Sequence, residues 1–81
     1  MNIALDYDGT FTEDPTLWSC FAALAAKRGH TVTIVTMRYP SEPIPDMPLP
    51  IVYTSRKAKA VAFKADIWID DKPHWLVTDS A

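Results

Sequence analysis

Hydrophobic positions along this chain form short apolar runs on either side of one amphipathic stretch. Residues 31–36 are β-branched at every position, and residues 2–6 contain a shorter apolar run, so both segments favour strands. Between them, apolar residues recur at the spacing of one helix face, at Leu17, Phe21, Leu24 and Ala25. The pattern predicts a strand–helix–strand unit with parallel strands.

The ends of this helix are also visible in the sequence. Asp14 and Pro15 suit the N-cap and the first helical position. Lys27 and Arg28 place positive charge in the last turn, and Gly29 is a typical helix stop. We therefore expect a helix that begins at Pro15 and ends before Gly29.

The segment 39–50 interrupts the α/β alternation, because it contains five prolines, at positions 40, 43, 45, 48 and 50. Proline at this density forbids a helix. We expect an extended crossover in place of the second helix of a doubly wound fold. A trimmed connection explains it most simply, and a loop that docks a partner is the alternative.

The second half predicts shorter elements. Strands are expected at 51–53 and 66–70, and a helix between them is expected to run from Thr54 or Ser55 to about Lys64. Its inward face would hold Ala58, Val61 and Ala62. A marginal fifth strand is expected at 75–77, and the last four residues are expected to fray.

Composition limits the class of protein. The 81 residues suit a single domain, 1–81, and a small core leaves room for a homo-oligomer to add stability. A net charge of −2 gives no general attraction to nucleic acid or anionic membranes, and no apolar run approaches the roughly 20 residues of a membrane span. The single cysteine excludes an internal disulfide and, with no secretion signal, favours the cytoplasm.

Two of the predicted strands end on acidic pairs, Asp6/Asp8 and Asp70/Asp71. In open parallel sheets, ligands bind at the carboxyl ends of the strands, where the strand order reverses. If strand 2–6 lies between strands 31–36 and 66–70, the two pairs share one crevice. Four carboxylates in one cleft need a cation or shifted pKa values, and Mg²⁺ suits an all-oxygen site.

The segment Asp6-Tyr7-Asp8-Gly9-Thr10 resembles the DxDGT signature of the haloacid dehalogenase (HAD) superfamily. Thr36, a basic residue before the fourth strand, and Asp70-Asp71 follow in that family's order, so the resemblance covers residues 2 to about 73. The form is most similar to small nucleotidase-type and phage or bacterial members.

The resemblance implies an α/β, three-layer Rossmann-like core with a mainly parallel sheet of four or five strands. The chain has no insertion between Thr10 and Pro15, and only twenty residues separate Thr36 from Lys57. Both usual cap sites are therefore empty, and no cap domain is expected.

The resemblance also implies an enzyme, a Mg²⁺-dependent phosphomonoesterase that forms an aspartyl phosphate. Asp6 would be the nucleophile and Asp8 the general acid and base. Thr36 would donate its hydroxyl to a phosphate oxygen, and the backbone N–H groups of Gly9 and Thr10 would help to cradle the phosphate. The metal set would be Asp6, Asp8, Asp70 and Asp71.

Three lysines are candidates for the residue that stabilises the transferred phosphoryl group. Lys57 is favoured, because it lies at the start of the predicted helix, and Lys59 and Lys64 compete. Arg38 and Lys59 are candidates for phosphate binding, although a solvated loop arginine is an equally good interpretation of Arg38.

The expected partner is a phosphorylated substrate, whether a small molecule, a nucleotide or a nucleic-acid end. A local excess of basic residues suits such an anion: Arg56, Lys57, Lys59, Lys64 and Lys72. The three tryptophans are expected in the core, and Trp75 alone stays open as a cleft residue. The alternative function is a non-catalytic module that binds Mg²⁺ or phosphate.

Overall fold

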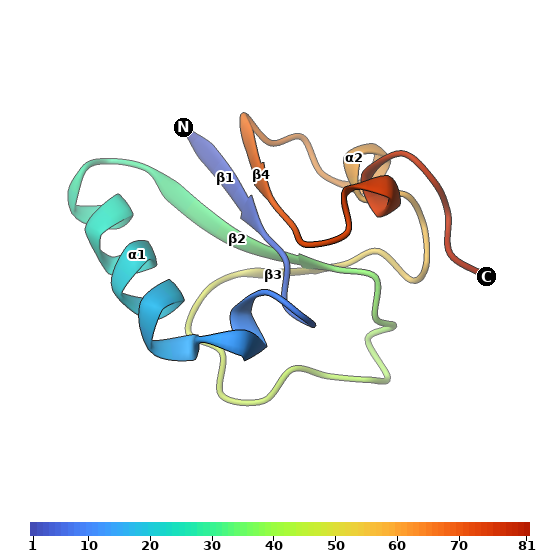
Figure 1. Ribbon diagram of the computed structural model, residues 1–81, viewed down its shortest axis with the longest axis horizontal. Coiled ribbons are helices and arrows are strands. Elements are labelled where there is room, and N and C mark those ends of the chain that lie inside the picture. The colour runs from blue at the N-terminus through green and yellow to red at the C-terminus, as the bar shows by residue number, and fades with distance from the viewer.

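Four parallel strands form one sheet in the computed structural model, which describes residues 1–81 (Figure 1). They are β1 (Asn2–Leu5), β2 (Thr31–Thr36), β3 (Ile51–Tyr53) and β4 (Ile67–Ile69), in the order β3-β2-β1-β4. The predicted parallel α/β architecture is confirmed, with β1 between β2 and β4.

The expected fifth strand at 75–77 is wrong. Residues Pro73–Leu76 form the short 3-10 helix η2. Pro73 lies in its first turn, where a residue without an N–H costs nothing and its fixed φ favours a helical turn over a strand.

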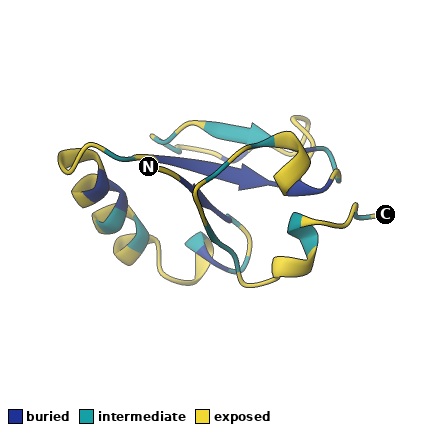
Figure 2. Ribbon diagram, turned by 90° about the horizontal axis from the view of Figure 1, so that it is seen from above, coloured by how far each residue is buried: buried dark blue, intermediate teal, exposed yellow.

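One face of the sheet forms the main core. Ile3 pairs with Val32 and Leu5 with Ile34, so these four side chains lie on the same face. All are at most 5% exposed, and Ala22, Ala25 and Ile44 complete the cluster. The central strands and the inner side of the long helix are the most buried parts of the molecule (Figure 2).

Helix α1 (Pro15–Lys27) has the predicted bounds, and a short 3-10 turn, η1 (Phe11–Glu13), precedes it. The Asp14 side chain accepts a hydrogen bond from the Leu17 N–H at 3.1 Å, as an N-cap does. The predicted inward face is only partly right, because Leu17 and Leu24 are 53% and 62% exposed. Ala25 of the predicted face is buried, and Ala22 is buried beside it; both are small, which lets the helix lie close to the sheet.

Residues 39–50 contain no helix, as predicted. Ile44 is buried, and Met47 and Leu49 pack against the core cluster. The Ile44 N–H donates to the Tyr53 hydroxyl at 3.0 Å. The proline-rich crossover therefore supplies part of the apolar cover that a helix would otherwise give.

The predicted helix from Thr54 or Ser55 to Lys64 is wrong, because α2 spans only Lys59–Ala62. Ser55 and Arg56 have φ values of 53° and 69°, a left-handed conformation that no α-helix contains. The Thr54 hydroxyl closes this turn by donating to the Lys57 carbonyl at 2.8 Å.

The inward side of α2 also differs from the prediction. Ala58 is buried, but Val61 is 85% exposed and Ala62 is exposed as well. A single helical turn cannot present the three-position stripe that a longer helix would bury.

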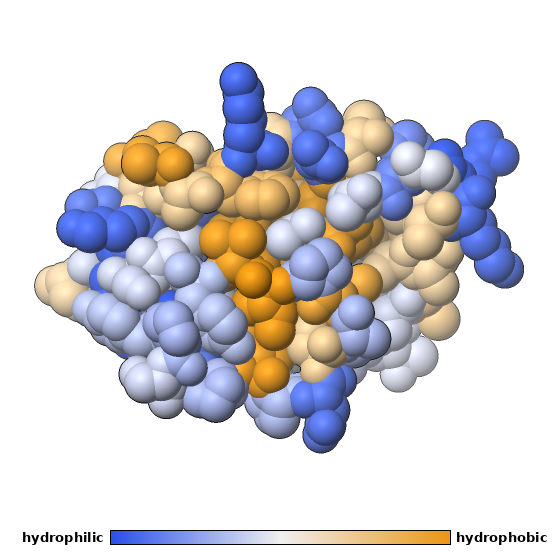
Figure 3. All heavy atoms as spheres, turned by 180° about the vertical axis from the view of Figure 1, so that it is seen from behind, coloured by the Kyte–Doolittle hydropathy of each residue, from blue (hydrophilic) through white to orange (hydrophobic).

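The surface seen from behind has a central band of apolar side chains surrounded by polar and charged groups (Figure 3). Small chains expose such surface because they bury a low fraction of their area. No helix in this structure has the length and apolar character that crossing a bilayer requires.

Candidate functional site

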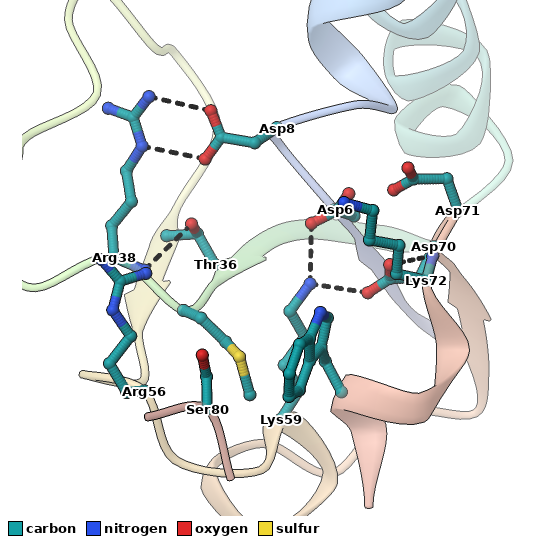
Figure 4. Close-up of a pocket in the computed structure, with 12 residues that line it drawn as sticks. Asp6, Asp8, Thr36, Arg38, Arg56, Lys59, Asp70, Asp71, Lys72 and Ser80 are labelled. Carbon is teal, nitrogen blue, oxygen red and sulfur yellow. Dashed lines mark hydrogen bonds and ion pairs between the residues drawn. The ribbon is translucent and has the colours of Figure 1, made fainter. Parts of the chain in front are cut away.

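The carboxyl ends of β1, β2 and β4 meet at one edge of the sheet and form a polar cleft of about 230 Å³ (Figure 4). The Asp6 N–H donates to the Ile69 carbonyl at 2.9 Å, which fixes Asp6 beside the end of β4. The lining residues are Asp6, Asp8, Thr36, Met37, Arg38, Arg56, Lys59, Asp70, Asp71, Lys72, Trp75 and Ser80. The predicted meeting of the two acidic pairs is confirmed.

A buried lysine joins the two acidic strand ends. Lys59 Nζ donates to Asp6 Oδ1 at 2.7 Å and to Asp70 Oδ2 at 2.6 Å. The side chains of Lys59, Asp6 and Asp70 are 4%, 8% and 3% exposed. If one partner of a buried ion pair is removed, the other keeps a charge that neither water nor protein compensates. The three side chains therefore depend on one another and form one unit.

The favoured lysine of the sequence, Lys57, lies outside this unit. Its side chain is 71% exposed and its only ion pair is with Asp79, at 3.9 Å. Lys64 is exposed and does not line the cleft. The preference for Lys57 is therefore corrected to Lys59, because the left-handed turn at 55–56 moves the helix start past Lys57.

The Thr10 side chain lies outside the cleft lining and connects the carboxylates of Asp6 and Asp71. Its hydroxyl lies 3.0 Å from Asp6 Oδ2 and 3.2 Å from Asp71 Oδ1, and it also accepts from the Asp71 N–H at 3.3 Å. Gly9 (φ 88°) is next to it, and a Cβ atom there would lie 2.6 Å from Asp71 Oδ2. A glycine is therefore required both by the backbone and by the carboxylate.

The predicted phosphate cradle of Gly9 and Thr10 differs in this structure. The Gly9 N–H donates to Thr12 Oγ1 at 3.0 Å, and the Thr10 N–H donates to the Tyr7 carbonyl at 3.3 Å. Neither residue lines the cleft. Both N–H groups are thus bonded within the chain, and it is the Thr10 hydroxyl that positions Asp6 and Asp71.

Three carboxylates are close enough to share a metal ion. Oxygen atoms of Asp6, Asp70 and Asp71 lie within 4.8 Å of one another. Each oxygen has two lone pairs, so those bonded to Lys59 or Thr10 can still coordinate a cation. An all-carboxylate set fits a hard divalent ion such as Mg²⁺, which commonly completes its shell with water and phosphate oxygens.

Asp8 is not part of this cluster, contrary to the predicted metal set. Both of its oxygens accept from Arg38, from Nε and Nη2, each at 2.9 Å. The guanidinium also lies 5.1 Å from the centre of the Tyr7 ring. Figure 4 shows this pair at one end of the cleft, apart from the Lys59 contacts. Arg38 is thus a cleft residue, but its bidentate partner here is Asp8.

Thr36 is placed as predicted, at the end of β2, where it is 2% exposed and lines the cleft. Its hydroxyl accepts from the Arg38 N–H at 3.3 Å. This contact leaves the hydroxyl proton free to be donated to an oxygen in the cleft.

The environment shifts the pKa values of three groups. Burial raises the pKa of Asp6 to about 6, against the opposing effect of its bond with Lys59. The pKa of Asp71 is lowered, mainly by a hydrogen bond with Asp6, and the bond to Asp8 raises the pKa of Arg38 further. An unusually basic carboxyl group in a cleft is a typical property of functional sites.

The charges of the cleft are balanced. Four carboxylates line it, and so do four basic side chains, those of Arg38, Arg56, Lys59 and Lys72. A bound divalent cation would give a surplus of two positive charges, which matches the nearly two negative charges of a phosphate monoester. The cleft is thus suited to a cation and a phosphate together.

Some cleft residues were not foreseen. Met37 and Ser80 line it, and the tail residue Asp79 contacts the turn before α2. Met37 follows Thr36, so its position was visible in the sequence. Ser80 and Asp79 had no signal, because their role depends on where the tail docks.

Comparison of the chain with protein-family models, with curated proteins and with solved structures gives no match. The description of the fold and the site therefore depends on the geometry of this chain alone.

Proposed function

We propose that this protein is a Mg²⁺-dependent phosphomonoesterase built on a HAD-type core without a cap domain. The observation that supports this best is the unit in which buried Lys59 bonds to both Asp6 and Asp70. It joins a candidate nucleophile, a candidate metal ligand and a fixed positive charge within hydrogen-bond distance.

In the first step, an Asp6 oxygen attacks phosphorus, and an Asp6 O–P bond forms as the bond to the leaving oxygen breaks. Lys59 and the Thr36 hydroxyl stabilise the charge on the phosphoryl oxygens. Asp8 gives a proton to the leaving oxygen, so its pair with Arg38 opens for this step.

In the second step, a water molecule attacks phosphorus and Asp8 takes its proton. The Asp6 O–P bond breaks, and inorganic phosphate leaves. Asp6, Asp70 and Asp71 are the residues that would hold Mg²⁺, which when bound offsets the repulsion between carboxylate and phosphate.

The size of the cleft suggests what kind of substrate it takes. At about 230 Å³ it is smaller than the roughly 300–1,000 Å³ of pockets that engulf a ligand. It suits the phosphoryl group and its nearest atoms, with the rest of the substrate outside. A nucleotide or a nucleic-acid end satisfies this condition, and so does any small phosphomonoester.

The test is release of p-nitrophenol from p-nitrophenyl phosphate, with Mg²⁺ and with EDTA, for the parent and for Asp6→Asn. Asp46→Asn is the matched control, because Asp46 is exposed, lies outside the cleft and makes no ion pair. We expect activity that requires Mg²⁺, survives in the control and disappears in Asp6→Asn. Activity that persists in Asp6→Asn would contradict the aspartyl-phosphate route.

The second candidate is a module that binds Mg²⁺ and phosphate without turnover. The bidentate pair of Asp8 with Arg38 favours it, because the guanidinium occupies both Asp8 oxygens, which a general acid would need to turn toward the leaving group. Inactivity of the parent, together with a melting temperature that Mg²⁺ raises through Asp70, would select this candidate.

A further inference from the structure

We propose that Asp79 is a positioning residue that holds Lys59 in the cleft. Its effect on catalysis rests on the function proposed above, whereas its effect on the placement of Lys59 does not. The inference comes from the tail of the chain, which was expected to fray and is instead bonded to the turn before α2.

Two hydrogen bonds attach the tail. Asp79 Oδ1 accepts from the Ala58 N–H at 2.7 Å, and the Ser80 N–H donates to the Arg56 carbonyl at 2.7 Å. The ion pair between Asp79 and Lys57 is longer, at 3.9 Å, and exposed, so it adds little. The first bond is therefore the main contact of the Asp79 side chain.

The turn that Asp79 contacts needs outside support. Ser55 and Arg56 are both left-handed without being glycine, which is a strained arrangement. Helix α2 has only four residues, and its own N-cap, Ala58, has no side chain able to accept a hydrogen bond. Asp79, from a distant part of the chain, instead accepts from the Ala58 N–H, one of the amide groups that the helix start leaves without a partner.

The supported residue is adjacent to the cleft lysine. Ala58 is 4% exposed, and the next residue, Lys59, extends to Asp6 and Asp70. A shift of the Ala58 backbone would move the Lys59 ammonium out of contact with both carboxylates. Displacements of about 1 Å in a catalytic group reduce rates by up to about 100-fold.

The test compares Asp79→Ala with Asp79→Asn, because asparagine keeps an oxygen acceptor for the Ala58 N–H and loses only the charge. Glu13→Ala is the control, because Glu13 is exposed, makes no ion pair and lies outside the cleft. The first readout is acylation of lysines by a small amine-reactive ester, mapped by mass spectrometry, with exposed Lys64, which makes no ion pair, as the internal reference. The second is kcat and KM for p-nitrophenyl phosphate with Mg²⁺.

We expect Lys59 to be protected in the parent, in Asp79→Asn and in the control, and to become reactive in Asp79→Ala. We also expect kcat to fall about tenfold in Asp79→Ala with little change in KM, and to be restored in Asp79→Asn. If Asp79→Ala does not fold, Ser80→Pro removes the neighbouring N–H bond and is expected to expose Lys59 in the same way.

Protection of Lys59 that is unchanged in Asp79→Ala, or in Ser80→Pro if that variant replaces it, would overturn the inference. An inactive parent that still shows the acylation pattern would refute the proposed function and leave the positioning role standing. The two failures are thus distinguishable.

Discussion

The Lys59 ammonium lies 2.7 Å from Asp6 Oδ1, and both side chains are less than a tenth exposed although they are 53 positions apart in the chain. No other lysine side chain bonds to Asp6 or Asp70. Lys57 and Lys64 are exposed, and Lys72 lines the cleft without an ion pair to either carboxylate. Substitution of Lys59 therefore tests directly which lysine acts in the cleft.

Replacing Lys59 with methionine is expected to lower kcat for p-nitrophenyl phosphate by about 100-fold or more, as loss of a transition-state donor does. It should also lower the melting temperature, because Asp6 and Asp70 would keep buried charge without a partner. Lys57→Met is the matched variant and is expected to keep most of the activity. If Lys57→Met is the inactive one, the assignment of the lysine is wrong.

Asp6 is expected to titrate well above an ordinary aspartate. Since burial raises its pKa to about 6, it should be protonated below pH 6 and ionised above it in the metal-free protein. Carbon-13 NMR of protein labelled at the aspartate carboxyl groups would follow this titration with pH. The signal of Asp6 is the one that is missing from the spectrum of Asp6→Asn. A bound cation favours the ionised form, so Mg²⁺ should lower the midpoint. A metal-free midpoint below 4 would contradict the burial argument.

Metal binding should depend on Asp70 and not on Asp8. Asp70 belongs to the three-carboxylate cluster, whereas Asp8 is held by Arg38. We expect Asp70→Asn to weaken Mg²⁺ binding at least about tenfold, measured by calorimetry. Loss of a residue that merely orients a metal ligand already costs about 10- to 100-fold in affinity, and loss of a ligand should cost no less. Asp8→Asn should leave the affinity nearly unchanged, and equal losses in both variants would place Asp8 among the ligands.

The ends of the strands could be predicted because the sequence pattern that indicates a strand lies within the strand itself. A β-branched run indicates a strand wherever it occurs, and parallel strands bring their carboxyl ends to one edge. Asp6 and Asp70 could therefore be placed together from the sequence alone, although more than sixty residues separate them.

The lysine could not be chosen in this way. Its identity depends on two left-handed residues, Ser55 and Arg56, in a turn without glycine, and nothing in the sequence predicts that conformation. The Arg38–Asp8 pair and the contact of Asp79 with Ala58 could not be predicted either. Each joins residues that are far apart in the sequence, and only the tertiary fold brings them together.

Gly9→Ala is expected to damage the site by displacing Asp71, and Gly29→Ala provides a close control. The two glycines have φ values of 88° and 84°, so alanine costs about 1–2 kcal/mol of backbone strain at either position. A Cβ atom at Gly9 would lie 2.6 Å from Asp71 Oδ2, whereas nothing lies within 4 Å of one at Gly29. Both variants should therefore lose similar stability through strain, and only Gly9→Ala should also lose Mg²⁺ affinity. Calorimetric titration with Mg²⁺, beside thermal unfolding of each variant, separates the two effects. Equal Mg²⁺ affinity in the two variants would show that Asp71 moves aside without cost and has no fixed place in the metal cluster.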